Sequence, residues 1–232
     1  MEKLKNQPDL LNSKYIANAR FNGFDLNCGE HNNPLYLAWN SAFVRQMENS
    51  LAEFLEDKAL GLPYVDWTQP IEKLNNPYVQ RIHSWSFGYN PKTGQNTTRK
   101  AGKYDNDEHE KRLAEAMSQK AFDDFYPLLE SLSNTFQAVM GGSLADESTA
   151  AFDPLFLLHR TFIDKVYKEW QDCRLAAGDA DWYKAVSGLD KPLNCFKDEK
   201  INSDPETLGI TMLRMIENRD AACFSYDSLS PC

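Results

Sequence analysis

The chain has 232 residues, 42% of them hydrophobic and 12% aromatic, which is enough for one domain with a substantial core. Its formal net charge of −9 argues against a nucleic-acid partner, because an acidic surface repels the phosphate backbone. No run of about 18 apolar residues is present, so we expect no membrane partner. Residues 1–11 are polar and lack the apolar stretch of a secretory signal, which favours a cytoplasmic protein.

The cysteines are odd in number and widely spaced, and none forms a Cys-x-x-Cys pair. This is not the pattern of a disulfide framework, so we expect mostly reduced thiols. One exception stays open, because the two cysteines nearest the C-terminus could tie down the tail. The five are Cys28, Cys173, Cys195, Cys223 and Cys232.

The first predicted helix covers residues 35–57, where apolar side chains recur at near-helical spacing. Glycine and proline at 61–63 stop it, and we expect an extended segment at 64–67. Residues 86–104 combine several glycines and prolines with much polar chain, which predicts a long surface excursion.

A charged helix is predicted at 107–120, with an apolar stripe formed by Leu113, Ala116 and Met117. The acidic residues around His109 place this histidine on a solvated face.

Further helices are predicted at 121–140, from Asp153 onward and at 205–217. Paired glycines at 141–142 end the first of these, as glycine commonly ends helices. Asp153 is a typical cap and Pro154 a typical first-turn residue. The fold class is therefore mainly α, with long loops and a few short strands.

Three passages carry a family pattern in their shared order. The first is Trp39-Asn40-Ser41 with Glu48, followed by the Pro-Tyr-Val-Asp-Trp run at 63–67. The second is Met-Gly-Gly at 140–142, and the third is Asp-Pro-Leu-Phe-Leu-Leu-His-Arg at 153–160, followed by Asp164. Residues 224–227 are similar to an aromatic closing motif.

These passages resemble the tyrosinase and hemocyanin family. In that family the first passage reads Trp-His-Arg followed by Pro-Tyr-Trp-Asp-Trp, and the passage at 153–160 reads Asp-Pro-Ile-Phe-x-Leu-His-His. The resemblance runs over roughly residues 20–227, so the whole chain, 1–232, is expected to be one such domain without a C-terminal lid domain. It implies a central four-helix bundle whose site residues project inward from facing helices.

The resemblance also implies which residues stand where the family places its six copper-ligating histidines. In chain order these are Asn22, His31, Asn40, Ser133, Gln137 and Arg160, so only one imidazole is kept. Copper favours neutral imidazole nitrogens, whereas an arginine would add a fixed positive charge. A dicopper centre is therefore not expected.

The rewritten positions would line a polar pocket for a small molecule. We expect His31, Arg160, Asn40 and Gln137 to be catalytic, with His31 as acid or base and Arg160 binding an oxyanion. Asn22 and Ser133 are the expected substrate-binding residues. A zinc ion held by Glu30, His31 and His159 is the expected cofactor, although His159 also reads as a packing residue.

Because most of the copper ligands are replaced, we expect the protein to be neither a copper oxidase nor an oxygen carrier. Similar fungal hemocyanin-like proteins without these histidines, the cyclopenases, contract a cyclopenin-type benzodiazepinedione to a viridicatin-type quinolone. They release methyl isocyanate and are associated with zinc. The resemblance implies a non-redox lyase or isomerase of secondary metabolism, acting on a small aromatic amide.

Two other functions stay open on the sequence alone. One is a non-catalytic protein that binds a small molecule in the former dicopper cavity. The other is a residual copper oxidase with an unrecognised ligand set. A homodimer is also left open.

Overall fold

The computed structural model describes residues 30–56, 61–70, 73, 80–81, 89–90, 94–100, 105–193, 209–217 and 226. Within these residues the structure is mainly helical, which confirms the predicted fold class. The helices are α4 (Tyr36–Leu55), α6 (Asn106–Ser118), α7 (Phe122–Met140), α8 (Pro154–Ala176) and α9 (Met212–Glu217), with 3-10 turns η3 (Gly142–Ala145) and η4 (Ala150–Phe152). A short antiparallel hairpin pairs β1 (Tyr89–Asn90) with β2 (Gln95–Asn96).

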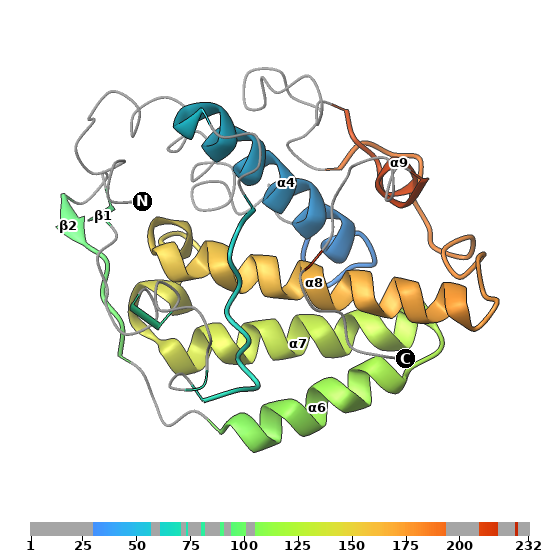
Figure 1. The fold of residues 1–232 in the computed structure, drawn as a ribbon, viewed down its shortest axis with the longest axis horizontal. Helices are drawn as coiled ribbons and strands as arrows, with labels where there is room; N and C mark the ends of the chain where they lie inside the picture. The colour runs from blue at the N-terminus through green and yellow to red at the C-terminus, as the bar shows by residue number, and fades with distance from the viewer. Residues whose placement is uncertain are drawn as a thin grey trace.

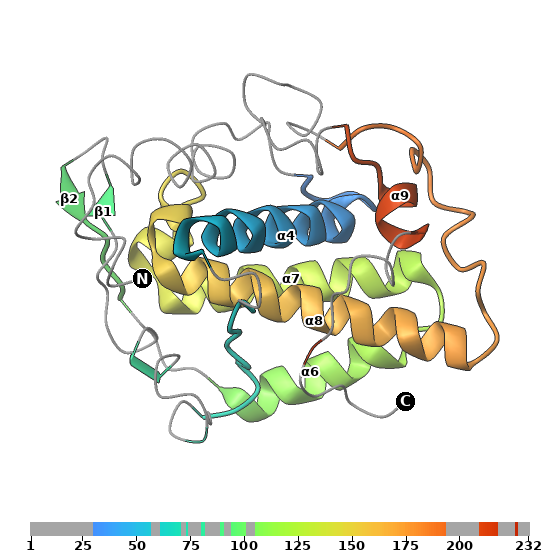
Figure 2. The same cartoon turned by 45° about the horizontal axis from the view of Figure 1, so that its top comes forward.

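The long helices lie side by side, with α8 packed along α4 and α6 packed along α7 (Figures 1 and 2). Helix α8 is the central element, because nearly all of its residues from Pro154 to Gln171 are buried. This explains why its sequence lacks the one-sided pattern of a surface helix. No helix of the described chain is long and apolar enough to cross a membrane.

Helix α8 begins where the sequence predicts. Asp153 caps it by accepting a hydrogen bond of 2.9 Å from the backbone N–H of Leu155, and Pro154 occupies the first turn. The Asp153 carboxylate also forms a buried ion pair with Arg99, whose Nε lies 2.8 Å from Oδ2. The loop at 97–100 is thereby anchored to the start of the central helix.

The same loop braces the end of α7. Gly141 and Gly142 both have positive φ, of 59° and 58°, and a Cβ on Gly142 would lie 2.2 Å from the carbonyl oxygen of Thr98. The backbone N–H of Ser143 donates to that oxygen at 2.7 Å. Glycine is therefore required at 142 both by the backbone conformation and by the close approach of residue 98.

His109 is not on a solvated face, and that prediction is wrong. Only 4% of the residue is exposed; Nδ1 lies 2.8 Å from the Asp105 carbonyl oxygen and the ring stands edge-on to Trp67. The spacing gives the reason, since His109 lies four and seven residues before Leu113 and Ala116. It therefore belongs to the inward stripe of α6, despite its acidic neighbours.

Two further predictions need correction. Cys173 is disulfide-bonded, so the expectation of reduced thiols is wrong for this residue, while the proposed pairing of Cys223 with Cys232 lies outside the described residues. The last helix starts at Met212, because Thr211 pairs with Pro192 in an isolated bridge and Gly209 has a φ of 69°.

The segment at 64–67 belongs to no regular element. One backbone hydrogen bond of 3.2 Å, from the N–H of Val65 to the carbonyl oxygen of Leu158, joins it to α8.

Candidate functional site

The guanidinium of Arg160 lies in the interior, where α8 faces α4. The residue is 3% exposed, and Nη1 donates a hydrogen bond of 2.9 Å to the phenol oxygen of Tyr36. The guanidinium carbon lies 4.8 Å from the centre of the Phe156 ring, one turn earlier on the same helix. Arg160 thus contributes a fixed positive charge that is shielded from water.

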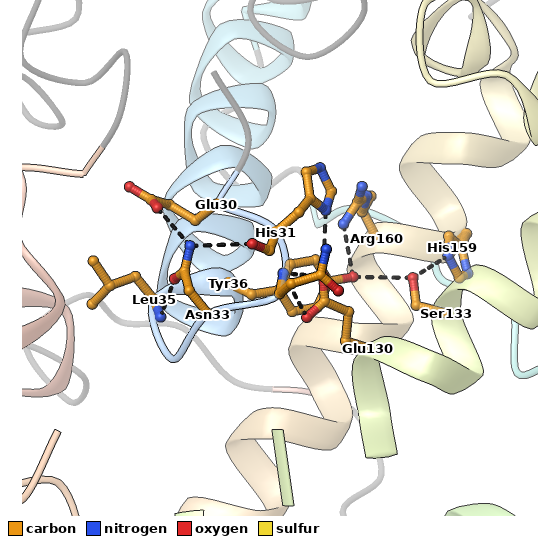
Figure 3. Close-up of polar contacts among 10 residues, drawn as sticks. Glu30, His31, Asn33, Leu35, Tyr36, Glu130, Ser133, His159 and Arg160 are labelled. Carbon is orange, nitrogen blue, oxygen red and sulfur yellow. Dashed lines mark hydrogen bonds and ion pairs between the residues drawn. The ribbon is translucent and has the colours of Figure 1, made fainter. Parts of the chain in front are cut away.

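A chain of hydrogen bonds continues from Tyr36 to the other helices (Figure 3). The Tyr36 hydroxyl donates to Ser133 Oγ on α7 at 3.0 Å, and Ser133 Oγ lies 3.0 Å from Nε2 of His159 on α8. Because the Tyr36 proton is given to Ser133, the serine hydroxyl can donate to His159 Nε2. We call Arg160, Tyr36, Ser133 and His159 the polar chain.

Burial fixes the protonation of the polar chain. It lowers the pKa of His159 well below the ordinary value, and the neighbouring Arg160 charge acts in the same direction. Burial likewise raises the pKa of Tyr36, against the opposing effects of Arg160 and Ser133. His159 is therefore a neutral imidazole with Nε2 as acceptor, and its buried Nδ1 has no hydrogen-bond partner. It stacks on Phe136 at 4.7 Å between ring centres.

His31 lies at the edge of this polar chain. Its Nδ1 is 3.4 Å from Oε1 of Glu130, and its ring centre is 5.8 Å from that of Tyr36. The His31 side chain is 26% exposed, whereas that of Glu130 is only 5% exposed. A solvent-accessible imidazole thus meets a buried carboxylate beside Tyr36.

The two amide side chains predicted to be catalytic, Asn40 and Gln137, each donate a hydrogen bond to a backbone carbonyl and not to a side chain of the polar chain. Asn40 donates from Nδ2 to the backbone carbonyl of Arg160 at 2.9 Å, while its buried Oδ1 has no hydrogen-bond partner. Gln137 donates from Nε2 to the carbonyl of Leu144 in η3, at 3.2 Å. Asn40 therefore lies against the polar chain, and Gln137 supports the turn after α7. The predicted substrate-binding residue Asn22 lies outside the described residues.

The sequence profile described as the common central domain of tyrosinase matches residues 12–127 and 92–173. The chain belongs to this family. Among curated proteins it is 29% identical to hemocyanin 2 of Megathura crenulata over 229 residues, covering 89% of this chain and 7% of that protein. It is also 29% identical to unit D of the hemocyanin beta-C chain of Helix pomatia over 201 residues, covering 78% of this chain and 48% of that protein.

The fold of this tyrosinase-family domain is similar to that of solved hemocyanins. A functional unit of octopus hemocyanin superimposes with a TM-score of 0.77 at 22% identity, covering 94% of this chain and 61% of that structure. Deoxygenated hemocyanin from Rapana thomasiana gives a TM-score of 0.76 at 19% identity, covering 96% and 64%. The chain therefore spans less than two thirds of the length of these relatives.

The residues at the family's copper positions do not fit a copper pair. The described ones offer a single imidazole, at His31, together with two amides, a hydroxyl and a guanidinium at Asn40, Gln137, Ser133 and Arg160. A guanidinium cannot lose its proton to become a ligand, and its charge would repel a cation.

The expected zinc ligands do not come together either. Glu30 accepts a hydrogen bond of 2.9 Å from Asn33, His31 faces Glu130, and His159 Nε2 faces Ser133 (Figure 3). Within the described part of the chain, no group of three histidine, cysteine or acidic side chains could hold a metal ion. The described residues therefore do not fit zinc by this ligand set.

Two residues of the site, Tyr36 and Glu130, were missed by the sequence reasoning. Tyr36 precedes Asn40 by one turn, and Glu130 precedes Ser133 by three residues, so each lies on the same helix face as a predicted site residue. The signal for Glu130 was a carboxylate between Leu129 and Leu132 on the buried face of α7. A charged group at such a position needs a partner.

Proposed function

We propose that this tyrosinase-family domain catalyses a non-redox reaction, as a lyase or isomerase acting on a small aromatic molecule with amide groups. The observation that carries the proposal is the polar chain itself. Arg160 and Ser133 stand at positions where the family keeps imidazoles, and both are built into one hydrogen-bonded array. Such an array can bind an oxygen atom of a substrate and polarise its bond.

Arg160 would supply the electrostatic part of the catalysis. It is a buried, permanent cation, and its Nε has no hydrogen-bond partner. A fixed donor in a water-poor site stabilises negative charge that develops on a carbonyl or epoxide oxygen. Removing one such donor costs about 10²–10³-fold in turnover in enzymes where this has been measured.

The reaction proposed first is the fragmentation of a cyclopenin-type benzodiazepinedione. The ring contracts to a viridicatin-type quinolone, and the lost carbon and nitrogen leave as methyl isocyanate. No external oxidant or reductant is needed, so the balance of the reaction suits a site without a copper pair. Among the described residues of the site, the neutral His159 and the partly exposed His31 carry imidazoles that would move protons.

The test is conversion of cyclopenin by the purified protein, followed by mass spectrometry of the quinolone product. We expect Arg160→Ala and His31→Ala to abolish turnover while the far-ultraviolet circular dichroism is kept. Arg174→Ala is the matched control, because Arg174 lies on the same helix but stacks on Trp170, away from the polar chain. Full activity in both site variants would contradict the assignment.

A second candidate function is that of a non-catalytic protein that binds a small molecule. It is supported by the hydrogen bonds that the polar chain makes within itself. Each of its four side chains is buried and bonded to another member, as in a network that only stabilises the fold. A non-catalytic binding protein would be stabilised against heat by cyclopenin or its quinolone product without converting either. Elemental analysis of the same preparation would show whether zinc or copper accompanies the protein.

A further inference from the structure

We infer that Glu130 is a positioning residue that holds His31 as a general base, with Nδ1 protonated and Nε2 free to accept a proton. The inference deepens the proposed function and rests on it for the identity of the reaction. It starts from the 3.4 Å separation between Nδ1 of His31 and Oε1 of Glu130. Contacts of this kind are often long in enzymes without substrate and tighten on binding.

Glu130 is fixed in place by a second contact. The backbone N–H of Asn32 donates to both carboxylate oxygens, at 2.9 Å to Oε1 and 3.2 Å to Oε2. Asn32 itself has a φ of 54°, a conformation that asparagine tolerates better than most residues. The loop that carries His31 is therefore attached to α7 through the same carboxylate that faces the imidazole.

The loop is also held from within. Asn33 accepts a hydrogen bond of 2.8 Å from the backbone N–H of Leu35 and donates one of 2.9 Å to Glu30 (Figure 3). These bonds order residues 30–35 directly before α4 begins. His31 is thus presented by a structured turn, which is what a catalytic base requires.

A carboxylate beside Nδ1 selects the imidazole tautomer. A carboxylate in this place accepts a hydrogen bond from Nδ1–H, so the proton stays on Nδ1 and the lone pair is left on Nε2, which is the role of the aspartate beside the histidine in serine proteases. The 26% exposure of His31 keeps the ring within reach of a substrate. Tyr36 contacts both the His31 ring and the Arg160 guanidinium, so the base lies next to the group that would polarise the substrate.

The inference is tested first without substrate, by nitrogen-15 NMR of the histidine side chains. At a pH where His31 is neutral, the wild-type protein should show a protonated Nδ1 and a bare Nε2. In Glu130→Gln the amide oxygen is still required by Asn32, so the amide N–H would face His31. The tautomer should then shift toward protonated Nε2. Asp124→Asn, on an exposed part of the same helix, should leave it unchanged.

The second readout is the rate at which diethyl pyrocarbonate modifies His31, followed by peptide mass. This reagent attacks the unprotonated nitrogen, so modification should be slower in Glu130→Gln than in the wild type or in Asp124→Asn. With cyclopenin as substrate, we expect Glu130→Gln to lose about tenfold or more of kcat at an unchanged melting temperature.

Each outcome bears on one proposal. A protonated Nε2 in the wild type would contradict the proposal that Glu130 positions His31. So would an unchanged tautomer and an unchanged rate of modification in Glu130→Gln. Normal turnover by Glu130→Gln would overturn its part in catalysis. If the wild-type protein leaves cyclopenin unchanged while tautomer and reagent rate respond to Glu130, the proposed reaction fails and the base at His31 stands.

Discussion

The Asp164 carboxyl gives the most direct quantitative test of the structure. It is 3% exposed and accepts hydrogen bonds from the hydroxyls of Ser41 on α4 and Tyr226, the latter at 2.6 Å. Burial raises the pKa of this carboxyl from 3.8 to about 6, and nearby Glu48 adds to the rise; the two hydroxyls and Lys168 oppose it. Asp164 therefore holds its proton in the folded protein at pH values where the unfolded chain has released it.

The sign of the effect on stability follows from this difference. Between about pH 4 and pH 6 the folded state binds more protons, so the contribution of Asp164 to stability falls as the pH rises. A rise of 2.2 units, from 3.8 to about 6, corresponds to roughly 3 kcal/mol at about 1.4 kcal/mol per unit. Asp164→Asn removes the titration and keeps a side chain of the same shape.

We expect the free energy of unfolding of Asp164→Asn, minus that of the wild type, to rise by roughly 3 kcal/mol between about pH 4 and pH 7. Urea titrations at several pH values measure it. The difference between the proteins is required, because His159 titrates with the opposite sign in an overlapping range. Asp124→Asn serves as the exposed control. A difference that stays constant with pH would refute the reasoning.

Three further predictions follow from described contacts. His159 is neutral when folded, so its contribution to stability should be lost as the pH falls below 6.5; in urea titrations the free energy of unfolding of His159→Gln, minus that of the wild type, should rise as the pH falls. Gly142→Ala should lower the melting temperature well beyond Gly178→Ala, because both glycines have positive φ but a Cβ would clash only at 142, with Thr98; equal losses would contradict this. Mass spectrometry should find Cys173 resistant to alkylation until the protein is reduced, and alkylation of the native protein would refute the disulfide.

Local signals in the sequence predict much of the fold. Apolar spacing placed α4 and α7 within a few residues of their ends, and Asp153 with Pro154 marked the start of α8. These signals depend on residues only one or two helical turns apart, so they can be read from the sequence even when the partner helices are unknown. The length of α9 was overestimated, because the helix begins only after Thr211, which forms a bridge with Pro192.

The contacts that build the site are long-range, and this limits what the sequence predicts. Tyr36 and Ser133 are 97 residues apart, and Tyr36 and Arg160 are 124 apart, so neither bond leaves a local pattern. Burial also hides roles, as with Glu130, which reads as an ordinary helix residue until its position against the His31 loop is seen. The resemblance to a known family gave Ser133 and Arg160, but not the tyrosine that joins them.

The hydrogen bonds from Arg160 through Tyr36 to Ser133 determine what a change at position 133 or 160 would do to the fold. They brace α8, α4 and α7 against one another by groups that the chain itself encodes. Replacing Ser133 and Arg160 with histidine would remove these hydrogen bonds before any ion could replace them. A single change to histidine at either position would therefore lower the stability of the fold, with no metal ion present to compensate for the loss.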